Sequence, residues 1–307
     1  MIHRSTKEKM HPRNRFRDGY DFAALIASSP PLARWVRRNA HGDPSIDYAE
    51  GDAVQALNRA LLKQAYEIAT WDVPGGYLCP PVPGRSDYVH HLADLLAKGR
   101  DGIPRGPGVR VLDIGVGASC IYPLIGTSEY GWSFVGSEVD PRALASAQGL
   151  AEANRRGDST SVFRLQEDRS RSFRGVIRPG ESYDASMCNP PFHASAADAR
   201  SQTERKRRNL GLLESTSPSR NFGGRAGELW CPGGELGFLL RMIAESVEVR
   251  DQVRWFTSLV SRSAHLPRLE RAVGDAGASE WTTLEMGQGQ KRSRILAWTF
   301  RASDLRV

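Results

Sequence analysis

Residues 189–192 read Asn-Pro-Pro-Phe and directly follow a short apolar segment. The exocyclic amine of an adenine is a poor nucleophile, because its lone pair is delocalised into the ring. The Asn189 side-chain oxygen and the Pro190 carbonyl can accept hydrogen bonds from such an amine and favour a tetrahedral nitrogen, while Phe192 stacks on the base. Two prolines with fixed φ angles would hold these acceptors in place. The motif predicts methyl transfer to an amine, with the catalytic residues Asn189, Pro190, Pro191 and Phe192.

A second motif, Asp-Ile-Gly-Val-Gly at residues 113–117, lies where another apolar segment gives way to the start of a helix. Glycines in such a turn let a cofactor approach backbone N–H groups closely. A dinucleotide fingerprint would need a third glycine where this chain has Cys120, which disfavours a nicotinamide cofactor. Glu138 ends the next predicted strand and is placed to accept hydrogen bonds from ribose hydroxyls. The motif predicts S-adenosylmethionine as the cofactor, bound by residues that include Asp113, Gly115, Gly117 and Glu138.

Both motifs need a sheet that brings the carboxyl ends of several strands to one edge. From residue 85 onward, strand-like and helix-like patterns alternate, as in a parallel sheet with crossover helices. Strands are predicted at 110–114, 132–138, 161–165, 183–188, 253–259, 280–286 and 294–300. Helices are predicted at 88–96, from 119, and at 141–155, 235–249 and 266–276. The predicted fold class is α/β, with a Rossmann-like seven-stranded S-adenosylmethionine-dependent methyltransferase core.

A small, mainly helical N-terminal module precedes this core. Helical patterns occupy residues 21–28, 31–37 and 52–66. Residues 72–84 are rich in proline and glycine, which is typical of a linker. We therefore predict that residues 1–84 form an RNA-binding module with a basic tail and the Pro/Gly linker, and that residues 85–307 form the methyltransferase domain. A segment at about 196–230 has little apolar periodicity and is predicted to be a mobile basic loop.

The chain carries a formal net charge of +7 and has a pI near 9.4. An excess of positive charge attracts polyanions and favours nucleic acid as a partner. Residues 10–20 combine arginines with aromatic side chains, a pattern that suits a phosphate backbone with stacked bases. The predicted RNA contacts are Arg13, Arg15, Arg17, Arg205, Lys206, Arg207 and Arg208.

Composition excludes several classes of protein. With 40% hydrophobic and 25% charged residues, the chain is not wholly disordered, collagen-like or a coiled coil. No stretch approaches the roughly 20 apolar residues of a membrane span, and the first residues lack the apolar segment of a secretory signal, so we expect a cytoplasmic protein. The cysteines and histidines show no metal-ligand spacing, and we therefore expect no metal.

Seven stretches of sequence resemble the 23S rRNA (adenine-N6) methyltransferases called RlmF, which are related to the eukaryotic enzyme that methylates adenine in spliceosomal small nuclear RNA. Together the stretches span nearly the whole chain. They lie at residues 10–16, 82–90, 113–123, 138–140, 188–193, 233–236 and 296–300. The run Gly-Ala-Ser-Cys-Ile-Tyr-Pro at residues 117–123 is more specific than the general glycine motif of the fold.

The resemblance implies the fold and cofactor already predicted, and it implies a substrate: 23S rRNA or a large-subunit assembly intermediate. S-adenosylhomocysteine would be the product left after methyl transfer, and we expect a monomer. Asp168 falls near the position that would touch the adenine of the cofactor, and Arg85 would pair with the methionine carboxylate. The cofactor-binding residues that the resemblance implies are Arg85, Gly115, Ser119, Glu138, Asp168 and Asn189.

Three other functions are compatible with parts of the sequence. A protein glutamine-N5 methyltransferase would act on an amide nitrogen with the same delocalised lone pair, but the basic N-terminal segment argues against it. A catalytically inactive RNA-binding protein would explain the charge but not the intact Asn-Pro-Pro-Phe motif. A nicotinamide dehydrogenase is disfavoured by Cys120. The leading prediction is an S-adenosylmethionine-dependent RNA adenine-N6 methyltransferase.

Overall fold

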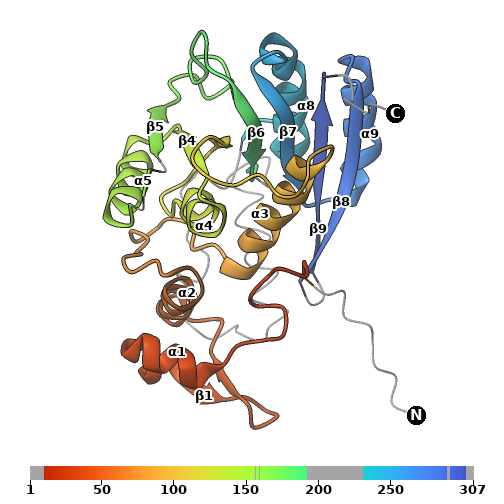
Figure 1. The fold of residues 1–307 in the computed structure, drawn as a ribbon. Coiled ribbons are helices and arrows are strands. Elements are labelled where there is room, and N and C mark those ends of the chain that lie inside the picture. Colours follow the sequence, from red (N-terminus) through yellow and green to blue (C-terminus); the bar gives the residue numbers. More distant parts are fainter. Residues whose placement is uncertain (1–9, 156, 159, 192–230, 289–290, 302–307) are drawn as a thin grey trace, which may run out of the picture.

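The structure, a computed structural model, describes residues 10–155, 157–158, 160–191, 231–288 and 291–301. Its centre is a seven-stranded sheet with the strand order β5-β4-β3-β6-β7-β9-β8 (Figure 1). The strands are β3 (Arg110–Ile114), β4 (Ser133–Glu138), β5 (Ser161–Leu165), β6 (Tyr183–Cys188), β7 (Val253–Val260), β8 (Glu280–Gln288) and β9 (Lys291–Thr299). The first five are parallel, and β9 runs antiparallel to both β7 and β8. All seven predicted strands are present, and the predicted fold class is confirmed.

Helices cover both faces of the sheet because its central strands are apolar on both sides. Val111 packs into a cluster with the helices of one face, whereas its neighbour Leu112 packs into a separate cluster on the other face. The helices of the first face are α3 (Val82–Ala97), α4 (Ile121–Tyr130) and α5 (Pro141–Ala153). Those of the second face are α8 (Gly234–Ser246), extended by η2 (Val247–Val249), and α9 (Leu266–Asp275). The result is a three-layer arrangement (Figure 1).

Asp140 shows how local sequence starts a helix directly after a strand. Its side chain accepts a hydrogen bond from the backbone N–H of Arg142 at 2.9 Å, and Pro141 occupies the first helical position of α5. Asp at an N-cap and Pro just inside the helix are the preferred residues at these positions. The turn between β4 and α5 is therefore short and well defined, and it lies at the carboxyl edge of the sheet.

The N-terminal elements lie beneath this edge in Figure 1. They are α1 (Phe22–Ser28), η1 (Pro30–Trp35), β1 (Val36–Arg38), β2 (Pro44–Ile46) and α2 (Gly51–Tyr66). The helix predicted at 31–37 is wrong in its last residues, because the chain leaves the 3-10 helix after Trp35 and enters an antiparallel hairpin of β1 and β2. Within the described residues, no helix is long and apolar enough to cross a bilayer.

The predicted boundary between residues 84 and 85 does not match the structure, because it falls inside α3. Leu57 and Leu61 of α2 belong to the same buried cluster as Val111 of the sheet, so the N-terminal elements and the sheet share one core. The linker predicted at 72–84 does not match the structure either, because residues 82–84 begin α3 and the part before them is docked on the sheet. Tyr77 donates a hydrogen bond to Asp140 at 2.8 Å, which holds this segment against the carboxyl edge of the sheet.

The basic segment at residues 10–20 is docked onto α3. The backbone N–H of His11 and the side-chain amide of Asn14 both donate to one oxygen of Asp87, at 2.8 and 2.9 Å. Asn14 also donates to the carbonyl of Pro83 at 2.9 Å. Phe16 is only 5% exposed and belongs to the apolar core, so it does not offer a ring for base stacking. This part of the predicted RNA-binding pattern is therefore incorrect.

Candidate active site

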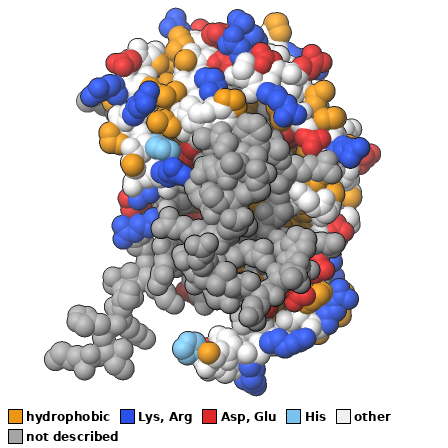
Figure 2. Space-filling model, turned by 180° about the vertical axis from the view of Figure 1, so that it is seen from behind, with side chains coloured by type: hydrophobic (Ala, Val, Ile, Leu, Met, Phe, Trp, Pro, Cys, Tyr) orange, Lys and Arg blue, Asp and Glu red, His pale blue; other side chains and the backbone are white. Residues whose placement is uncertain are grey.

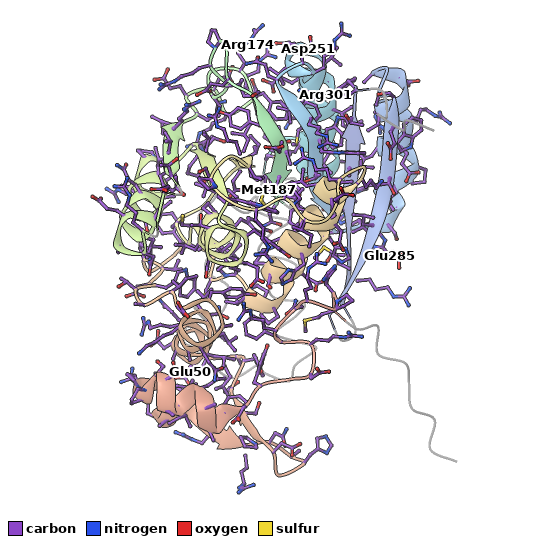
Figure 3. All side chains as sticks on the ribbon, in the orientation of Figure 1. Glu50, Arg174, Met187, Asp251, Glu285 and Arg301 are labelled. Atoms are coloured by element: carbon purple, nitrogen blue, oxygen red, sulfur yellow. The ribbon has the colours of Figure 1, made fainter. Side chains whose placement is uncertain are left out.

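The register of the sheet explains how three candidate residues come together. Ile114, the last residue of β3, lies opposite Ser137 of β4 on one side and Cys188 of β6 on the other. The next residues along the three chains are therefore neighbours at the carboxyl edge: they are Gly115, Glu138 and Asn189. In Figure 3, Met187, near the end of β6, marks the edge of the sheet that faces the N-terminal elements. Arg174 and Asp251 mark the opposite edge.

A cavity of about 680 Å³ opens at this edge. Its size falls within the usual range of small-molecule sites, about 300–1,000 Å³. The structure places most of the predicted cofactor-binding residues on its wall: Arg85, Gly115, Gly117, Ser119, Glu138, Asp168 and Asn189. Leu78 and Pro80, from the segment predicted to be a linker, complete the wall.

The glycine turn after β3 has the backbone conformation that its sequence predicts. Gly115 and Gly117 have φ angles of 73° and 64°, which are readily adopted only by glycine. The N–H groups of Gly115 and Val116 donate to the carbonyl of Ser137 at 3.0 and 2.9 Å, which ties the turn to β4. Cys120, where a dinucleotide fingerprint has its third glycine, also has a positive φ, 50°. This cysteine is buried in the core and does not line the cavity.

Glu138 is 6% exposed and accepts three backbone hydrogen bonds. One oxygen accepts from the N–H groups of Val139 and Asp140, at 2.8 and 3.1 Å, and the other accepts from Gly117 at 3.0 Å. Burial raises the pKa of this carboxyl, and the three N–H donors oppose the shift. A carboxylate has about four acceptor positions, so the oxygen facing Gly117 can still accept from a ligand hydroxyl.

Asp113 is not on the cavity wall. It is fully buried behind the glycine turn, and neither of its carboxyl oxygens has a hydrogen-bond partner among the described residues. Burial, and after it the nearby Glu138, raise the pKa of Asp113 to about 8, while Arg85 acts in the opposite direction. The structure therefore places Asp113 beneath the glycine turn, where contact with a ligand in the cavity would be indirect.

Several cationic side chains line the cavity. Arg85, in the first turn of α3, donates to the hydroxyl of Tyr122 at 3.1 Å and lies over its ring. Three further arginines that the sequence analysis did not single out also line the wall: Arg169, Arg171 and Arg241. These groups make the cavity suited to a ligand with an anionic group. Within the described ranges, no group of three or more His, Cys, Asp or Glu side chains is arranged to hold a metal ion.

The loop after β5 contributes a polar wall. Gln166, which sequence reasoning missed, is buried and lines the cavity; its oxygen accepts from the N–H of Asp168 at 3.0 Å. Asp168 itself is exposed at the cavity mouth, where hydrogen bonds from Ser170 lower the pKa of its carboxyl. The position of Gln166 directly after β5, at the carboxyl edge of the parallel strands, was the available signal for it.

Asn189 is the first residue after β6 and lines the cavity. Its side-chain oxygen is buried, yet it has no hydrogen-bond partner among the described residues. An unpaired buried acceptor is costly unless a ligand group completes it, so this atom is a candidate position for binding a ligand. Pro190 is buried and Pro191 lines the cavity, whereas Phe192 lies outside the described residues.

Two of the three predicted RNA-binding arginines of the N-terminal segment, Arg13 and Arg15, have side-chain partners within the protein, whereas the buried Nε of Arg17 has none among the described residues. Arg13 donates to Asp94 at 2.6 Å and to Tyr130 at 3.1 Å, and Arg15 donates to Glu129 at 3.0 Å. Arg17 is half-buried. Arg15 nevertheless keeps about half of its side chain exposed, 52%. The remaining predicted contacts, Arg205 to Arg208, lie outside the described residues.

The chain also matches known proteins along almost its whole length. Residues 4–302 match the model of a family described as RNA methyltransferase. The chain belongs to this family. The resemblance seen in the sequence motifs is thus confirmed, and the protein is an S-adenosylmethionine-dependent RNA methyltransferase.

Individual relatives of this RNA methyltransferase agree with the family match. It is 52% identical over 303 residues to the "Ribosomal RNA large subunit methyltransferase F" of Ectopseudomonas mendocina (strain ymp), covering 98% of this chain and 91% of the relative. It is also 52% identical over 300 residues to the protein of the same name from Salmonella agona (strain SL483), covering 98% and 96%.

Solved structures show the same fold. The catalytic domain of human METTL16, in complex with the MAT2A 3′UTR hairpin 1, is 31% identical to this chain and superimposes with a TM-score of 0.80. The match covers 96% of this chain and 97% of the METTL16 chain. The N-terminal domain of human METTL16 in complex with SAH is 29% identical, with a TM-score of 0.74, 95% of this chain covered and 99% of that chain.

Proposed function

We propose that this RNA methyltransferase transfers the methyl group of S-adenosylmethionine to the N6 amine of an adenosine in 23S ribosomal RNA. The observation that carries the proposal is the buried oxygen of Asn189 on the wall of the cofactor-sized cavity, which has no hydrogen-bond partner in the described part of the chain. The names of the 52% identical relatives support the large ribosomal subunit as the source of the substrate.

The cavity residues fit the cofactor. Glu138 has an acceptor position for ribose hydroxyls, the glycine turn leaves room for close approach, and Arg85 offers a cation for the methionine carboxylate. Ser119 and Asp168 line the same cavity, and we assign the adenine to the end at Asp168. When bound, S-adenosylmethionine supplies an electrophilic methyl group.

The Asn-Pro-Pro turn would prepare the nucleophile. The Asn189 oxygen and the Pro190 carbonyl accept one hydrogen bond each from the N6 amino group of the adenosine. These bonds favour a tetrahedral nitrogen whose lone pair faces the methyl group, and they stabilise the positive charge that develops on that nitrogen. The proton in excess after transfer leaves to water. We assign base stacking to Phe192, as its place in the sequence predicts.

RNA would be held by the basic segments. We propose that Arg15 and Arg17, together with the segment from Arg205 to Arg208, contact phosphates on either side of the target base. Arg13, which pairs with Asp94, would support the docked segment and contribute less directly. A finished large-subunit rRNA or an assembly intermediate would be the partner of a monomeric, cytoplasmic protein.

The proposal is tested by following labelled methyl groups from S-adenosylmethionine into isolated 23S rRNA and total protein. We expect label in RNA, recovered as N6-methyladenosine after digestion to nucleosides. The Asn189→Ala variant should transfer about a hundredfold more slowly, the scale of losing one preorganised acceptor. Asn154→Ala removes an amide that lies away from the cavity and should behave like the wild type. Label in protein glutamine, or an unimpaired Asn189→Ala variant, would contradict the proposal.

A further inference from the structure

A fully buried tyrosine of α3 contacts the backbone immediately before Asn189. Tyr88 and Thr257 are both 0% exposed, and their hydroxyl groups are 2.8 Å apart. The Tyr88 hydroxyl also accepts a hydrogen bond from the N–H of Cys188, the last residue of β6, at 3.3 Å. The Thr257 hydroxyl donates to the carbonyl of Ser186 at 2.8 Å. Two side chains from distant parts of the chain thus bond two backbone groups in the last three residues of β6, the carbonyl of Ser186 and the N–H of Cys188.

The direction of each hydrogen bond follows from these contacts. The Thr257 hydroxyl has a single hydrogen, which it gives to the carbonyl of Ser186. The bond between the two hydroxyls must therefore be donated by Tyr88. The Tyr88 oxygen is left to accept from the Cys188 N–H, so every donor in this short network is used once.

The network stands where the strand ladder between β6 and β7 ends. The pairing of β6 with β3 continues to Cys188, opposite Ile114, but its register with β7 extends only to Ser186, opposite Phe256. Beyond Ser186, hydroxyl groups bond the backbone of Cys188: its N–H donates to Tyr88 of α3, and its carbonyl accepts from Ser258 of β7 at 3.5 Å. This leaves the Asn-Pro-Pro turn held on one side by β3 and on the other by side chains rather than by a regular strand.

We propose that Tyr88, through Thr257 and Cys188, is a positioning residue that holds the turn carrying Asn189 in its amine-accepting orientation. The inference rests on the proposed function, because it assumes that Asn189 accepts a hydrogen bond from the target amine. Tyr88 does not line the cavity, so its action on the reaction is transmitted through the backbone at Cys188.

The same helix turn also carries the candidate contact to the methionine carboxylate. Arg85 lies three residues before Tyr88, on the same side of α3. Both contact Tyr122: Arg85 donates to its hydroxyl at 3.1 Å, and the Tyr88 ring packs edge-on against it with ring centres 5.4 Å apart. One turn of α3 therefore carries both the guanidinium assigned to the methionine carboxylate and the hydroxyl that bonds the backbone before the amine acceptor.

The test compares Tyr88→Phe, which keeps the ring and removes the hydroxyl, with a matched control. Tyr66→Phe removes another buried tyrosine hydroxyl that bonds Ser86 of the same helix, but this hydroxyl does not contact β6. Three quantities are measured for each variant: the single-turnover rate of methyl transfer to 23S rRNA, the Kd for S-adenosylhomocysteine, and Tm. We expect Tyr88→Phe to slow the single-turnover rate at least tenfold while the Kd stays within twofold of the wild type. Tyr66→Phe should keep both values even if its Tm falls.

A second pair of variants covers the case in which Tyr88→Phe does not fold. Thr257→Val removes the hydroxyl that accepts from Tyr88 and should slow the single-turnover rate, whereas Thr257→Ser keeps a hydroxyl and should retain most of it. A wild-type rate in Tyr88→Phe or Thr257→Val, or equal losses in Tyr88→Phe and Tyr66→Phe, would overturn the positioning role. The proposed function fails separately, if Asn189→Ala itself reacts at the wild-type rate. If Asn189→Ala transfers methyl groups slowly but Tyr88→Phe reacts at the wild-type rate, only the positioning role of Tyr88 is contradicted and the proposed function stands.

Discussion

At the scale of single residues, Glu138 holds its place through three backbone hydrogen bonds and still faces the cavity. A hydrogen bond to a charged acceptor contributes about 1.5–3 kcal/mol, which is roughly a factor of ten to a hundred in affinity. Glu138→Ala should therefore bind S-adenosylhomocysteine at least tenfold more weakly in calorimetry, and Glu138→Gln should fall between this variant and the wild type. Unchanged affinity in Glu138→Ala would show that the ribose hydroxyls bind elsewhere.

Asp113 predicts a dependence of stability on pH. Its pKa is raised to about 8 in the folded protein, mainly by burial, against about 3.9 in an unfolded chain. Because the folded value is the higher one, the contribution of Asp113 to stability is fully present below about pH 4 and is lost as the pH rises toward 8. Asp113→Asn stays neutral throughout this range.

As the pH is raised from 5 to 8.5, we expect the Tm of Asp113→Asn to rise relative to the Tm of the wild type. The measurement is thermal unfolding of the cofactor-free proteins across that range. Asp168→Asn is the control, because Asp168 is exposed and the pKa of its carboxyl is lowered rather than raised. Parallel Tm curves for Asp113→Asn and the wild type would mean that Asp113 is ionised in the fold.

At the scale of elements, the sheet and its helices could be predicted because their signals are local. The central strands are apolar runs that end in a glycine turn, an acid or a proline pair, and these endings also marked the site residues. The expected parallel pairing brought Gly115, Glu138 and Asn189 to one edge of the sheet, and the structure supplied the register that makes them neighbours. The β1–β2 hairpin was missed because each strand has only three residues, too few to show alternation.

The segments at 10–20 and 72–84 were misread for a different reason. Arginine with aromatics, or proline with glycine, looks the same in sequence whether a segment is free or docked. Whether such a segment is docked depends on its hydrogen-bond partners. The partners of His11 and Asn14 lie about 70 residues away, on α3. Gln166 was missed likewise, because its burial depends on the loop that folds back over it: its amide donates to the carbonyl of Arg174 at 2.9 Å.

The docked N-terminal segment has a direct test in Asn14→Ala. The Asn14 side chain donates to Pro83 and Asp87 and accepts from the N–H of Phe16 at 3.0 Å, and it is 4% exposed. Its loss leaves buried polar groups unpaired, so we expect a fall of about 2–3 kcal/mol in the free energy of unfolding. Denaturant unfolding measures this change, and limited proteolysis should cut near residues 10–20. Arg15→Ala, at an exposed ion pair, should change stability by less than about 1 kcal/mol. Wild-type stability of Asn14→Ala would mean that the segment is held by other contacts.

At the scale of the whole molecule, the net charge of +7 is not gathered into a single patch on the face that Figure 2 shows. Basic and acidic side chains alternate over its described surface. RNA affinity should then depend on particular basic segments more than on the overall charge. The sequence from Arg205 to Arg208 is the densest of these, with four cations in succession.

Replacing Arg205, Lys206, Arg207 and Arg208 with alanine should weaken RNA binding and reduce the slope of log K against log salt. Each lost phosphate contact removes roughly 0.7–0.9 from that slope. The affinity for S-adenosylhomocysteine should stay unchanged, which separates a loss of RNA contacts from a loss of folding. A wild-type salt slope would show that this segment makes no phosphate contacts.

The central claim, N6 methylation of a large-subunit adenosine by the Asn189 turn, is tested most directly by mapping N6-methyladenosine in rRNA by mass spectrometry. The comparison needs cells that contain the protein, cells that lack it, and cells that carry only the Asn189→Ala variant. We predict that one N6-methyladenosine of 23S rRNA disappears without the protein, returns with the wild type and stays absent with Asn189→Ala. An rRNA map that is identical in all three strains would contradict the claim.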